Sequence, residues 1–469
     1  MKPLQAYLGL ALTLTPTLAC TIEPPRYGGG PICRKIEDRR ASPRPPKRRN
    51  LGALFSAEAF VNDHLVEDLR ATPAPRARDV NRFDDVFVSS WYRGPRRSTR
   101  PPAPDSWRPS TEESRFDIES AHVVEAGRRR FDLIVDDEWG WRTAAAMVSV
   151  SMAEQLGFWV PPTYLVHAGD LRIVLVERQG DVGATPAVGT RDGDPNDVID
   201  HGDRRILRVH GLYAWFVGST SYGEHNLRDR YLGENPTGHL VHEVLPLPDA
   251  LGLGEYLRRL EPDETDANFG ERLITFGFAT RAEAAAPPRD RAHRLELLFR
   301  KQMGDLGPDH PPGERLRRDD AYWFARRLMA TSIRRAVEAA ELSPTKAKDL
   351  EAVLTARRKS MVERICRDVS PLQLSHFHHD EKGGTAWLED MWLTWNLPNV
   401  EGGTYEVTTL AGDVEALSLE SWRGRIRLRW RGPVSTYSVL AIRRCTASRC
   451  APPAQLHLAP NGSFRAFIH

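Results

Sequence analysis

The stretch DPNDVIDHGDRRILRVHGLYAWFVGSTSYGEHNLRD, residues 194–229, decides the fold of this chain. Its first half places apolar side chains three and four residues apart, which predicts a buried helix. These side chains are Ile206, Leu207, His210, Tyr213, Ala214 and Val217. The polar run that follows predicts a loop, and residues 239–245 then alternate loosely as a strand that ends at Pro246. We therefore expect a helix, a polar loop and a strand in succession.

Upstream of this stretch, the sequence predicts an antiparallel lobe that contains one helix. The predicted strands are residues 121–125, 130–135, 164–167 and 171–177. Ala126-Gly127 is typical of the hairpin turn between the first two strands, and Ala168-Gly169-Asp170 is the expected turn between the last two. Residues 142–156 carry apolar side chains at helical spacing and end at Gly157, whereas the Gly/Asp-rich residues 180–194 predict a loop. A hairpin, a helix and further strands indicate an α+β lobe.

Two packed helices are predicted downstream. Residues 318–342 repeat apolar side chains at three- and four-residue steps, and Ser343-Pro344 is typical of the cap and first position of a second helix. The second helix has an apolar face made of Leu350, Val353, Leu354, Met361 and Ile365. We expect Arg357, Arg358 and Lys359 to lie outside that face, in solvent.

The last part of the chain, residues 384–469, predicts a small β-sandwich-like domain. Its expected strands are residues 387–395, 403–410, 425–430, 435–443 and 455–458, separated by Gly, Pro and Asn. The tryptophans of this region are Trp387, Trp392, Trp395, Trp422 and Trp430. Packing in the core is the first interpretation. An exposed aromatic platform, which would make the protein an adhesin or glycan binder, is the alternative.

Several blocks together resemble secreted bacterial proteins of undefined role. The blocks are DVNRFDDVFVSSW, FDLIVDD, DPNDVIDHGDRRILRVHGLYAW, HLVHEVL and DDAYWFARRLMATSIRRAVEAAELSPTKAKDLEAVLTARRKSMVERI. The cores of these proteins look like the HipA-type and lipid-kinase-like branch of the protein-kinase fold. The resemblance implies a two-lobed kinase-like core over residues 51–380, with an N-lobe at about 78–190 and a C-lobe at about 191–380.

The resemblance also implies that the catalytic residues have been replaced. Phosphoryl transfer needs a lysine on an early strand, an acid that orients the nucleophile, and an Asn and an Asp that bind magnesium. The matching positions carry Ile134, Ala146, Thr220, His225 and Pro246 in place of the lysine, its helix carboxylate, the acid, the Asn and the metal-binding Asp. Losing these charges together costs orders of magnitude in rate. We therefore expect a catalytically silent domain with no cofactor.

Migrated catalytic residues are the alternative, and only in that case would ATP and magnesium be cofactors of a phosphotransferase. The candidate substitutes in the old loop are Glu224, His225 and Asn226, and Asp249 follows the segment that replaces the metal site. Asp136, Asp137 and Glu138 follow the strand that carries Ile134. Clusters of carboxylates are more often solvated surface.

Two other kinds of chemistry are weaker hypotheses. Ser219, Ser221 and His225 suggest a hydrolase, but the chain has no Gly-x-Ser-x-Gly elbow. A metal site is conceivable in a His-rich run made of His376, His378, His379 and Asp380.

The N-terminal residues predict export. Lys2 precedes an apolar run, Leu8–Leu14, that is too short to span a bilayer, and Thr17-Leu18-Ala19-Cys20 resembles the lipobox of bacterial lipoproteins. We expect residues 1–20 to be a signal peptide and Cys20 to carry a lipid anchor, with an ordinary cleaved signal as the alternative. The Pro/Arg-rich residues 21–50 predict a tether. The expected location is the cell envelope, on the outer membrane or facing the periplasm.

The net charge limits the possible partners, and the cysteines indicate possible disulfides. The 65 basic and 63 acidic residues give a formal net charge of +2, which argues against nucleic acid as a partner and leaves an unknown protein or glycan. In an exported protein, the cysteines other than Cys20 are disulfide candidates. We expect Cys445 and Cys450 to close a turn, and Cys33 to pair with Cys366.

Overall fold

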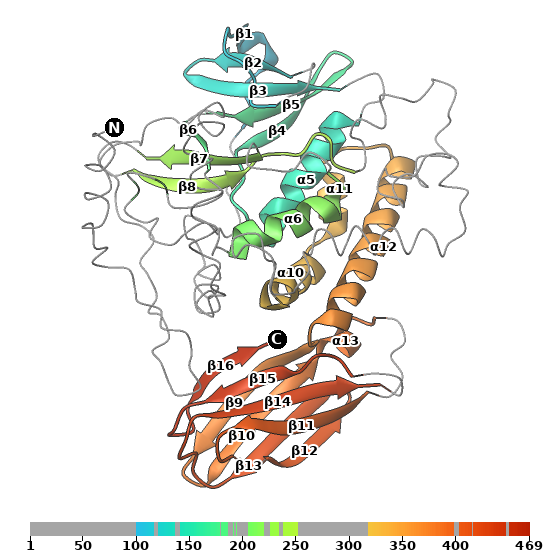
Figure 1. Cartoon of the computed structure of the whole chain (residues 1–469). Helices are drawn as coiled ribbons and strands as arrows, with labels where there is room; N and C mark the ends of the chain where they lie inside the picture. The colour runs from blue at the N-terminus through green and yellow to red at the C-terminus, as the bar shows by residue number, and fades with distance from the viewer. Residues whose placement is uncertain are drawn as a thin grey trace, which may run out of the picture.

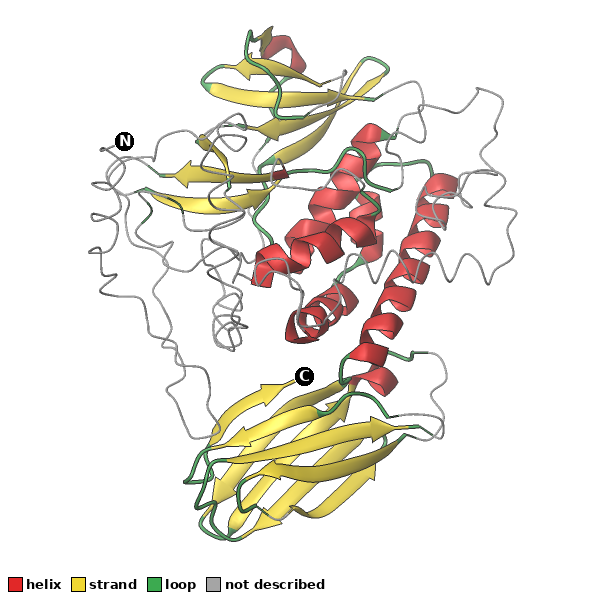
Figure 2. Ribbon diagram, viewed as in Figure 1, coloured by secondary structure: helices red, strands yellow, loops and turns green. Residues whose placement is uncertain are grey.

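The computed structural model describes residues 100–116, 121–136, 141–178, 180–185, 191, 194, 205–219, 226–233, 238–251, 318–397, 403–414, 416–446 and 450–469. In this part of the chain, helices occur together with antiparallel sheets, so the fold is α+β (Figure 1). Helices occupy the middle of the molecule, between strands at one end and a pair of sheets at the other (Figure 2). The predicted signal peptide, Cys20, Cys33 and the tether lie outside the described residues.

A five-stranded sheet contains the predicted hairpin and the two strands after it. Its order is β1 (Trp107–Pro109), β2 (Ala121–Ala126), β3 (Arg129–Val135), β5 (Leu171–Glu177) and β4 (Thr163–Ala168). The turns are tight because Gly127 and Gly169 adopt φ of 63° and 61°, a conformation that glycine adopts without strain. Both hairpins are therefore confirmed.

The predicted helix over residues 142–156 is confirmed as α5 (Arg142–Leu156), which ends at Gly157 with φ 99°. It is buried along most of its length, and its side chains join one core with those of α6 (Arg205–Val217) and α10 (Arg318–Ala330). The helix predicted from residues 206–217 is thus also present. Because α5 contacts both the five-stranded sheet and the helices, the main hydrophobic core lies between them, and a smaller core lies on the other face of the sheet.

A three-stranded sheet has the order β6 (Asp181–Ala184), β7 (Leu227–Leu232) and β8 (His239–Val244). The strand β8 was predicted, but β6 lies in a segment that we expected to be a loop, and β7 was not expected. Neither strand shows apolar alternation, because Asp181, Arg228 and Arg230 form ion pairs in the folded protein. Because their sequences are polar, neither strand could be recognised from a pattern of apolar residues.

The first of the two downstream helices is broken. The structure has α10 and then α11 (Ile333–Glu338), because Ser332 accepts a hydrogen bond from the backbone N of Arg335 and caps a new helix. The second helix, α12 (Pro344–Asp368), begins after Ser343 as predicted. The expectation for Arg357 was wrong, because its side chain is buried with the apolar face of α12. Among the described residues, no helix has the length and apolar character needed to cross a bilayer.

The C-terminal region consists of two four-stranded antiparallel sheets (Figure 1). One has the order β12 (Ala416–Trp422), β13 (Arg425–Arg431), β10 (Gly383–Asp390) and β9 (Leu372–Asp380). The other has the order β11 (Thr404–Ala411), β14 (Ser438–Cys445), β15 (Ala454–Leu458) and β16 (Phe464–Ile468). Leucine, isoleucine and valine side chains from both sheets share one core.

Three details of this region differ from the prediction. The sheets begin at Leu372 and not near residue 384, because β9 pairs with β10. The strand expected over residues 387–395 stops at Asp390, whose side chain accepts a hydrogen bond from the backbone N of Trp392 and starts α13 (Met391–Thr394). The strands β12 and β16 were not predicted.

Candidate functional site

The positions that the resemblance assigns to the phosphate-binding lysine and its carboxylate are apolar and closed to solvent. Ile134 on β3 is paired with Ala121 and Val174 in the sheet, and its side chain is 0% exposed. Ala146 on α5 is also 0% exposed, in the same core. A phosphate would meet hydrocarbon at both positions, and an uncompensated charge in such surroundings is strongly unfavourable.

The segment after β8, which would carry the metal-binding aspartate, is fixed against α5. The backbone N of Leu247 donates to Oγ of Ser149 at 2.9 Å, and this hydroxyl donates to the carbonyl of Ala146 at 3.0 Å. Tyr213 on α6 donates its hydroxyl to the Ser149 carbonyl at 2.7 Å. Burial raises the pKa of Tyr213 well above its usual range, so this phenol is a fixed donor. Pro246 is buried within this arrangement.

The predicted loop residues are only partly described. Thr220, Ser221, Glu224 and His225 lie outside the described residues. Asn226 is buried just before β7, and its carbonyl accepts a hydrogen bond of 2.8 Å from the backbone N of Leu245.

Asp249 and Asp136, two of the predicted substitutes, have separate roles in the described residues. Oγ of Ser219 is 2.9 Å from both carboxylate oxygens of Asp249, so this pair comes together. Asp136 accepts hydrogen bonds from the backbone N and Oγ1 of Thr143, at 2.8 and 2.6 Å, and therefore caps the start of α5. Asp137 and Glu138 lie outside the described residues.

A buried set of ion pairs, which the sequence analysis missed, connects the five-stranded and three-stranded sheets. Nε of Arg115 lies 2.5 Å from Oδ2 of Asp132 on β3, and its Nη1 lies 3.8 Å from Oδ2 of Asp181 on β6. Asp181 is also 2.8 Å from Nη2 of Arg228 on β7. The four side chains are at most 8% exposed. Asp132 within the apolar strand FDLIV was the available signal, because a buried carboxylate needs a partner.

A second set of ion pairs flanks the chain connection between the two sheets. Arg230 on β7 lies 3.2 Å from Glu243 on β8 and 3.9 Å from Glu177 at the end of β5. Glu177 is also 2.9 Å from Arg129 on β3. Gly180 lies in this connection. Only glycine fits there, because its φ is +80° and a Cβ would lie 2.3 Å from the carbonyl oxygen of Tyr231. These contacts hold the two sheets in one relative position.

Asp229 on β7 is the centre of a third buried polar cluster. Its Oδ1 accepts from Thr185 Oγ1 at 2.5 Å and lies 2.7 Å from Nδ1 of His242, while Oδ2 lies 3.0 Å from Arg191. In a nucleophilic triad the histidine stands between the hydroxyl and the carboxylate. Here the hydroxyl contacts the carboxylate directly, so the arrangement secures the sheet and does not activate Thr185.

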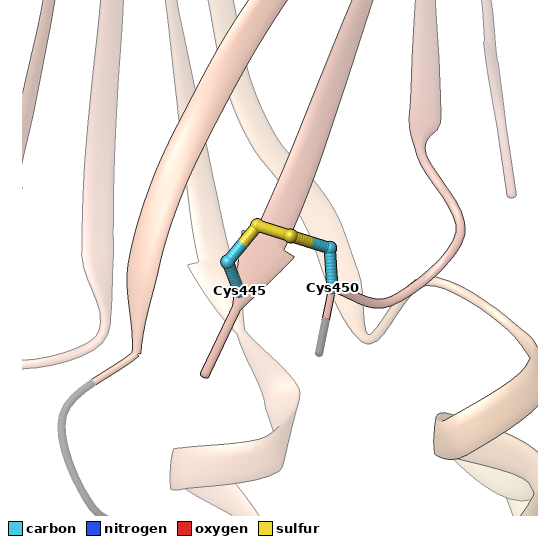
Figure 3. Close-up of a disulfide and its surroundings, with 2 residues drawn as sticks. All are labelled: Cys445 and Cys450. Carbon is cyan, nitrogen blue, oxygen red and sulfur yellow. A yellow bond between two sulfur atoms is a disulfide. The ribbon is translucent and has the colours of Figure 1, made fainter. Parts of the chain in front are cut away.

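The cysteines behave in two ways. Cys445 at the end of β14 forms a disulfide with Cys450, as predicted (Figure 3). Cys366 on α12 is a free, buried thiol, so its expected pairing with Cys33 is wrong. Its environment is the hydrophobic core, which favours a neutral thiol over an ion, and burial raises the pKa of this group.

The His-rich run does not assemble a metal site. His376, His378, His379 and Asp380 lie along β9. Across the described residues, the only three potential ligand groups that converge are Glu406 and the two disulfide cysteines, whose sulfur atoms are already bonded to each other.

The five tryptophans do not form one platform. Trp392 and Trp430 are buried, Trp387 and Trp395 are half-buried, and Trp422 is exposed with the guanidinium of Arg425 5.5 Å from its ring centre. Core packing therefore accounts for the first two.

No protein-family model matches the chain, and no curated protein matches it. Among solved structures, it is similar to the crystal structure of a Helicobacter pylori proinflammatory kinase, CtkA, with a TM-score of 0.35 and 9% identity, over 55% of this chain and 95% of that chain.

Proposed function

We propose that this chain is a lipid-anchored envelope protein with a two-lobed kinase-like core that no longer transfers phosphate and acts by binding or scaffolding. The carrying observation is the closed, apolar character of the positions held by Ile134, Ala146 and Pro246. Phosphoryl transfer depends on charges placed around the phosphates, and these positions offer none.

The ion pairs between the sheets support the binding role. A kinase must open and close its two lobes around a nucleotide, and this motion needs an interface that can rearrange. Asp181 in the N-lobe is buried against Arg228 in the C-lobe, and Glu177 lies beside Arg230 in the same way. Separating these charges in a dry interior is costly, which favours a rigid body that presents a constant surface.

Phosphotransfer assays test the absence of catalysis. The full-length protein is incubated with ATP and magnesium, and both nucleotide binding and phosphate release or transfer are measured. We expect neither above the level of a heat-denatured sample.

The contact between Ser219 and Asp249 is the observation that favours a migrated active site instead. Turnover that Asp249→Asn or Glu224→Gln abolishes, and that Asp170→Asn in an exposed turn leaves intact, would overturn the proposal for the core. Asp170 is a matched control because it is an exposed carboxylate.

The anchor is tested separately. We expect Cys20→Ala to abolish incorporation of labelled palmitate and to move the protein from the membrane fraction to the soluble fraction, whereas Cys33→Ala changes neither. Unchanged labelling in Cys20→Ala would show that the anchor is not at this residue.

A further inference from the structure

The outward face of β13 carries a row of arginines. Ile426, Leu428 and Trp430 point into the core, and the residues that alternate with them, Arg425, Arg427, Arg429 and Arg431, point to the other face. Consecutive side chains on one face of a strand are about 7 Å apart. The sheet therefore presents a line of guanidinium groups on the side away from the hydrophobic core.

Neighbouring strands add polar side chains to the same face. Arg429 is paired with Thr385 on β10 and with Ser418 on β12, and Thr385 is paired with His378 on β9. Residues directly opposite in a sheet project from the same face, so these four side chains form one row. In the next row, Arg431 and Asp380 stand on either side of Gly383.

A hollow of about 430 Å³ lies over these two rows. Lys382, Arg429, Arg431, His378, Thr385 and Ser418 are among the residues that line it. Gly383 is part of the lining, and only glycine fits there, because its φ is +138° and a Cβ would lie 2.2 Å from the carbonyl oxygen of Trp430. The volume falls in the range of small-molecule sites, roughly 300–1,000 Å³.

The three cations of the hollow outnumber the carboxylates near them, which are Asp380 in the lining and Glu420, whose negative charge Arg429 also attracts. Arg427, one row away, is paired with Glu420 on β12. Within the described residues, no ion pair joins Lys382, Arg429 or Arg431 to a carboxylate. A guanidinium offers a planar fork of donors that fits phosphate, sulfate or carboxylate. The hollow therefore has the charge of an anion site.

We propose that this hollow binds an anionic saccharide. Arg429 and Arg431 would hold the phosphate, sulfate or carboxylate group, while the hydroxyls of Thr385 and Ser418 and the carboxylate of Asp380 would bind sugar hydroxyls. Asp380 disfavours a bare anion, since its own charge repels one, but it accepts hydrogen bonds from hydroxyls. This inference concerns the C-terminal sheets and does not depend on the proposal for the core.

Single-stranded nucleic acid, another polyanion, fits the hollow less well. Such binding normally adds exposed aromatic rings on which bases stack. The aromatic residue of the lining, Trp430, is 3% exposed and packs in the core. Beside its cations, the lining offers the hydroxyls of Thr385 and Ser418 and the carboxylate of Asp380, which favours a sugar.

Binding of the full-length protein to five probes tests the proposal by calorimetry at fixed low salt. The probes are heparin, polygalacturonate, glucose 6-phosphate, neutral dextran and a dT oligonucleotide. The variants are the double change Arg429→Gln/Arg431→Gln, Thr385→Val, and the control Arg443→Gln. Arg443 is an exposed arginine on the other sheet, so its loss changes net charge away from the hollow.

We expect at least one anionic saccharide to bind. The double variant should bind it roughly tenfold more weakly, or more weakly still, since two charge-assisted contacts are lost. Thr385→Val is expected to weaken binding of the saccharide several-fold. Arg443→Gln is expected to change this binding less than twofold. Binding of polymers alone points to an envelope glycan as the source, and binding of glucose 6-phosphate points to a soluble sugar phosphate.

Three outcomes would overturn the inference. One is no binding of any anionic saccharide. Another is equal weakening by Arg443→Gln and the double variant, which would mean attraction by net charge alone. The third is tighter binding of the oligonucleotide that the double variant removes. Unchanged circular dichroism spectra and melting temperatures of the variants establish that the fold is intact.

Discussion

Nε of Arg444 on β14 lies 2.7 Å from Oδ2 of Asp390 at the end of β10, and this buried ion pair joins the two C-terminal sheets. Asp390 also accepts hydrogen bonds from the Tyr405 hydroxyl on β11, at 2.7 Å, and from the backbone N of Trp392 in α13. One carboxylate thus connects both sheets and the short helix. The sandwich is held by this polar contact as well as by its apolar core.

We expect Asp390→Ala to be strongly destabilising, because it leaves Arg444 buried without its anion. Removing one partner of a buried pair costs about 3–5 kcal/mol of unfolding free energy. Tyr405→Phe removes one hydrogen bond and should cost about 1 kcal/mol. Urea unfolding followed by tryptophan fluorescence measures both. The control is Glu381→Gln in an exposed turn, and a loss for Asp390→Ala no larger than that of the control would contradict this assignment.

Acid sensitivity is predicted for the junction between the sheets. Burial by itself raises the pKa of Asp181, but attraction to Arg228 and Arg115 more than offsets it, so the pKa lies below its ordinary value. A lowered carboxyl pKa contributes stability that is present above the unfolded pKa of about 3.9 and is lost as the pH falls through the folded pKa. Asp181→Asn should therefore cost about 3 kcal/mol near neutral pH, and the difference from the natural protein should shrink below about pH 4.

Urea titrations at a series of pH values between neutral and about pH 3 measure this difference. Asp170→Asn, in an exposed turn, is the control and should give only a small difference. A constant difference between Asp181→Asn and the natural protein across the acid range would rule out an ionised, paired Asp181.

The anchoring of the segment after β8 to α5 gives a third prediction. Ser149→Ala removes the acceptor of the Leu247 N–H in a buried setting, which costs about 1–3 kcal/mol. It should also speed hydrogen exchange at Leu247, measured by mass spectrometry of deuterated peptides. Ser151→Ala, a half-buried position on the same helix, should leave the exchange at Leu247 unchanged. Equal exchange in the two variants would mean that Ser149 does not hold this segment.

The parts of the fold that the sequence predicted are local. The helix over residues 142–156 could be placed because Gly157 ends it, and the hairpins because Gly127 and Gly169 make their turns. Each of these signals lies within a few residues of the element that it defines. The strand β6 depends instead on β7, a partner far along the chain, and no local signal revealed it.

The candidate site was predictable only in part, for a similar reason. The resemblance assigns charged residues to the positions of Ile134 and Ala146, and both side chains are buried in an apolar core. The pairing of Arg115 with Asp181 could not be predicted, because two isolated charges in a sequence do not specify which opposite charge the fold will bring to each. The prediction that Arg357 lies in solvent was wrong, because it relied on the rule that a charged residue next to an apolar face is usually solvated.

The three cysteines within the described residues should differ in their reactions. The Cys445–Cys450 bond closes a loop of sequence separation 5, for which the chain-entropy model gives about 2 kcal/mol. Cys445→Ser/Cys450→Ser should therefore lower the unfolding free energy by this amount, as measured by urea unfolding under non-reducing conditions.

Cys366 should resist iodoacetamide in the native protein and react after denaturation, because the thiolate that attacks the reagent is disfavoured by burial. Peptide mapping by mass spectrometry separates the sites, and labelling of Cys366 in the native state would show that α12 opens there.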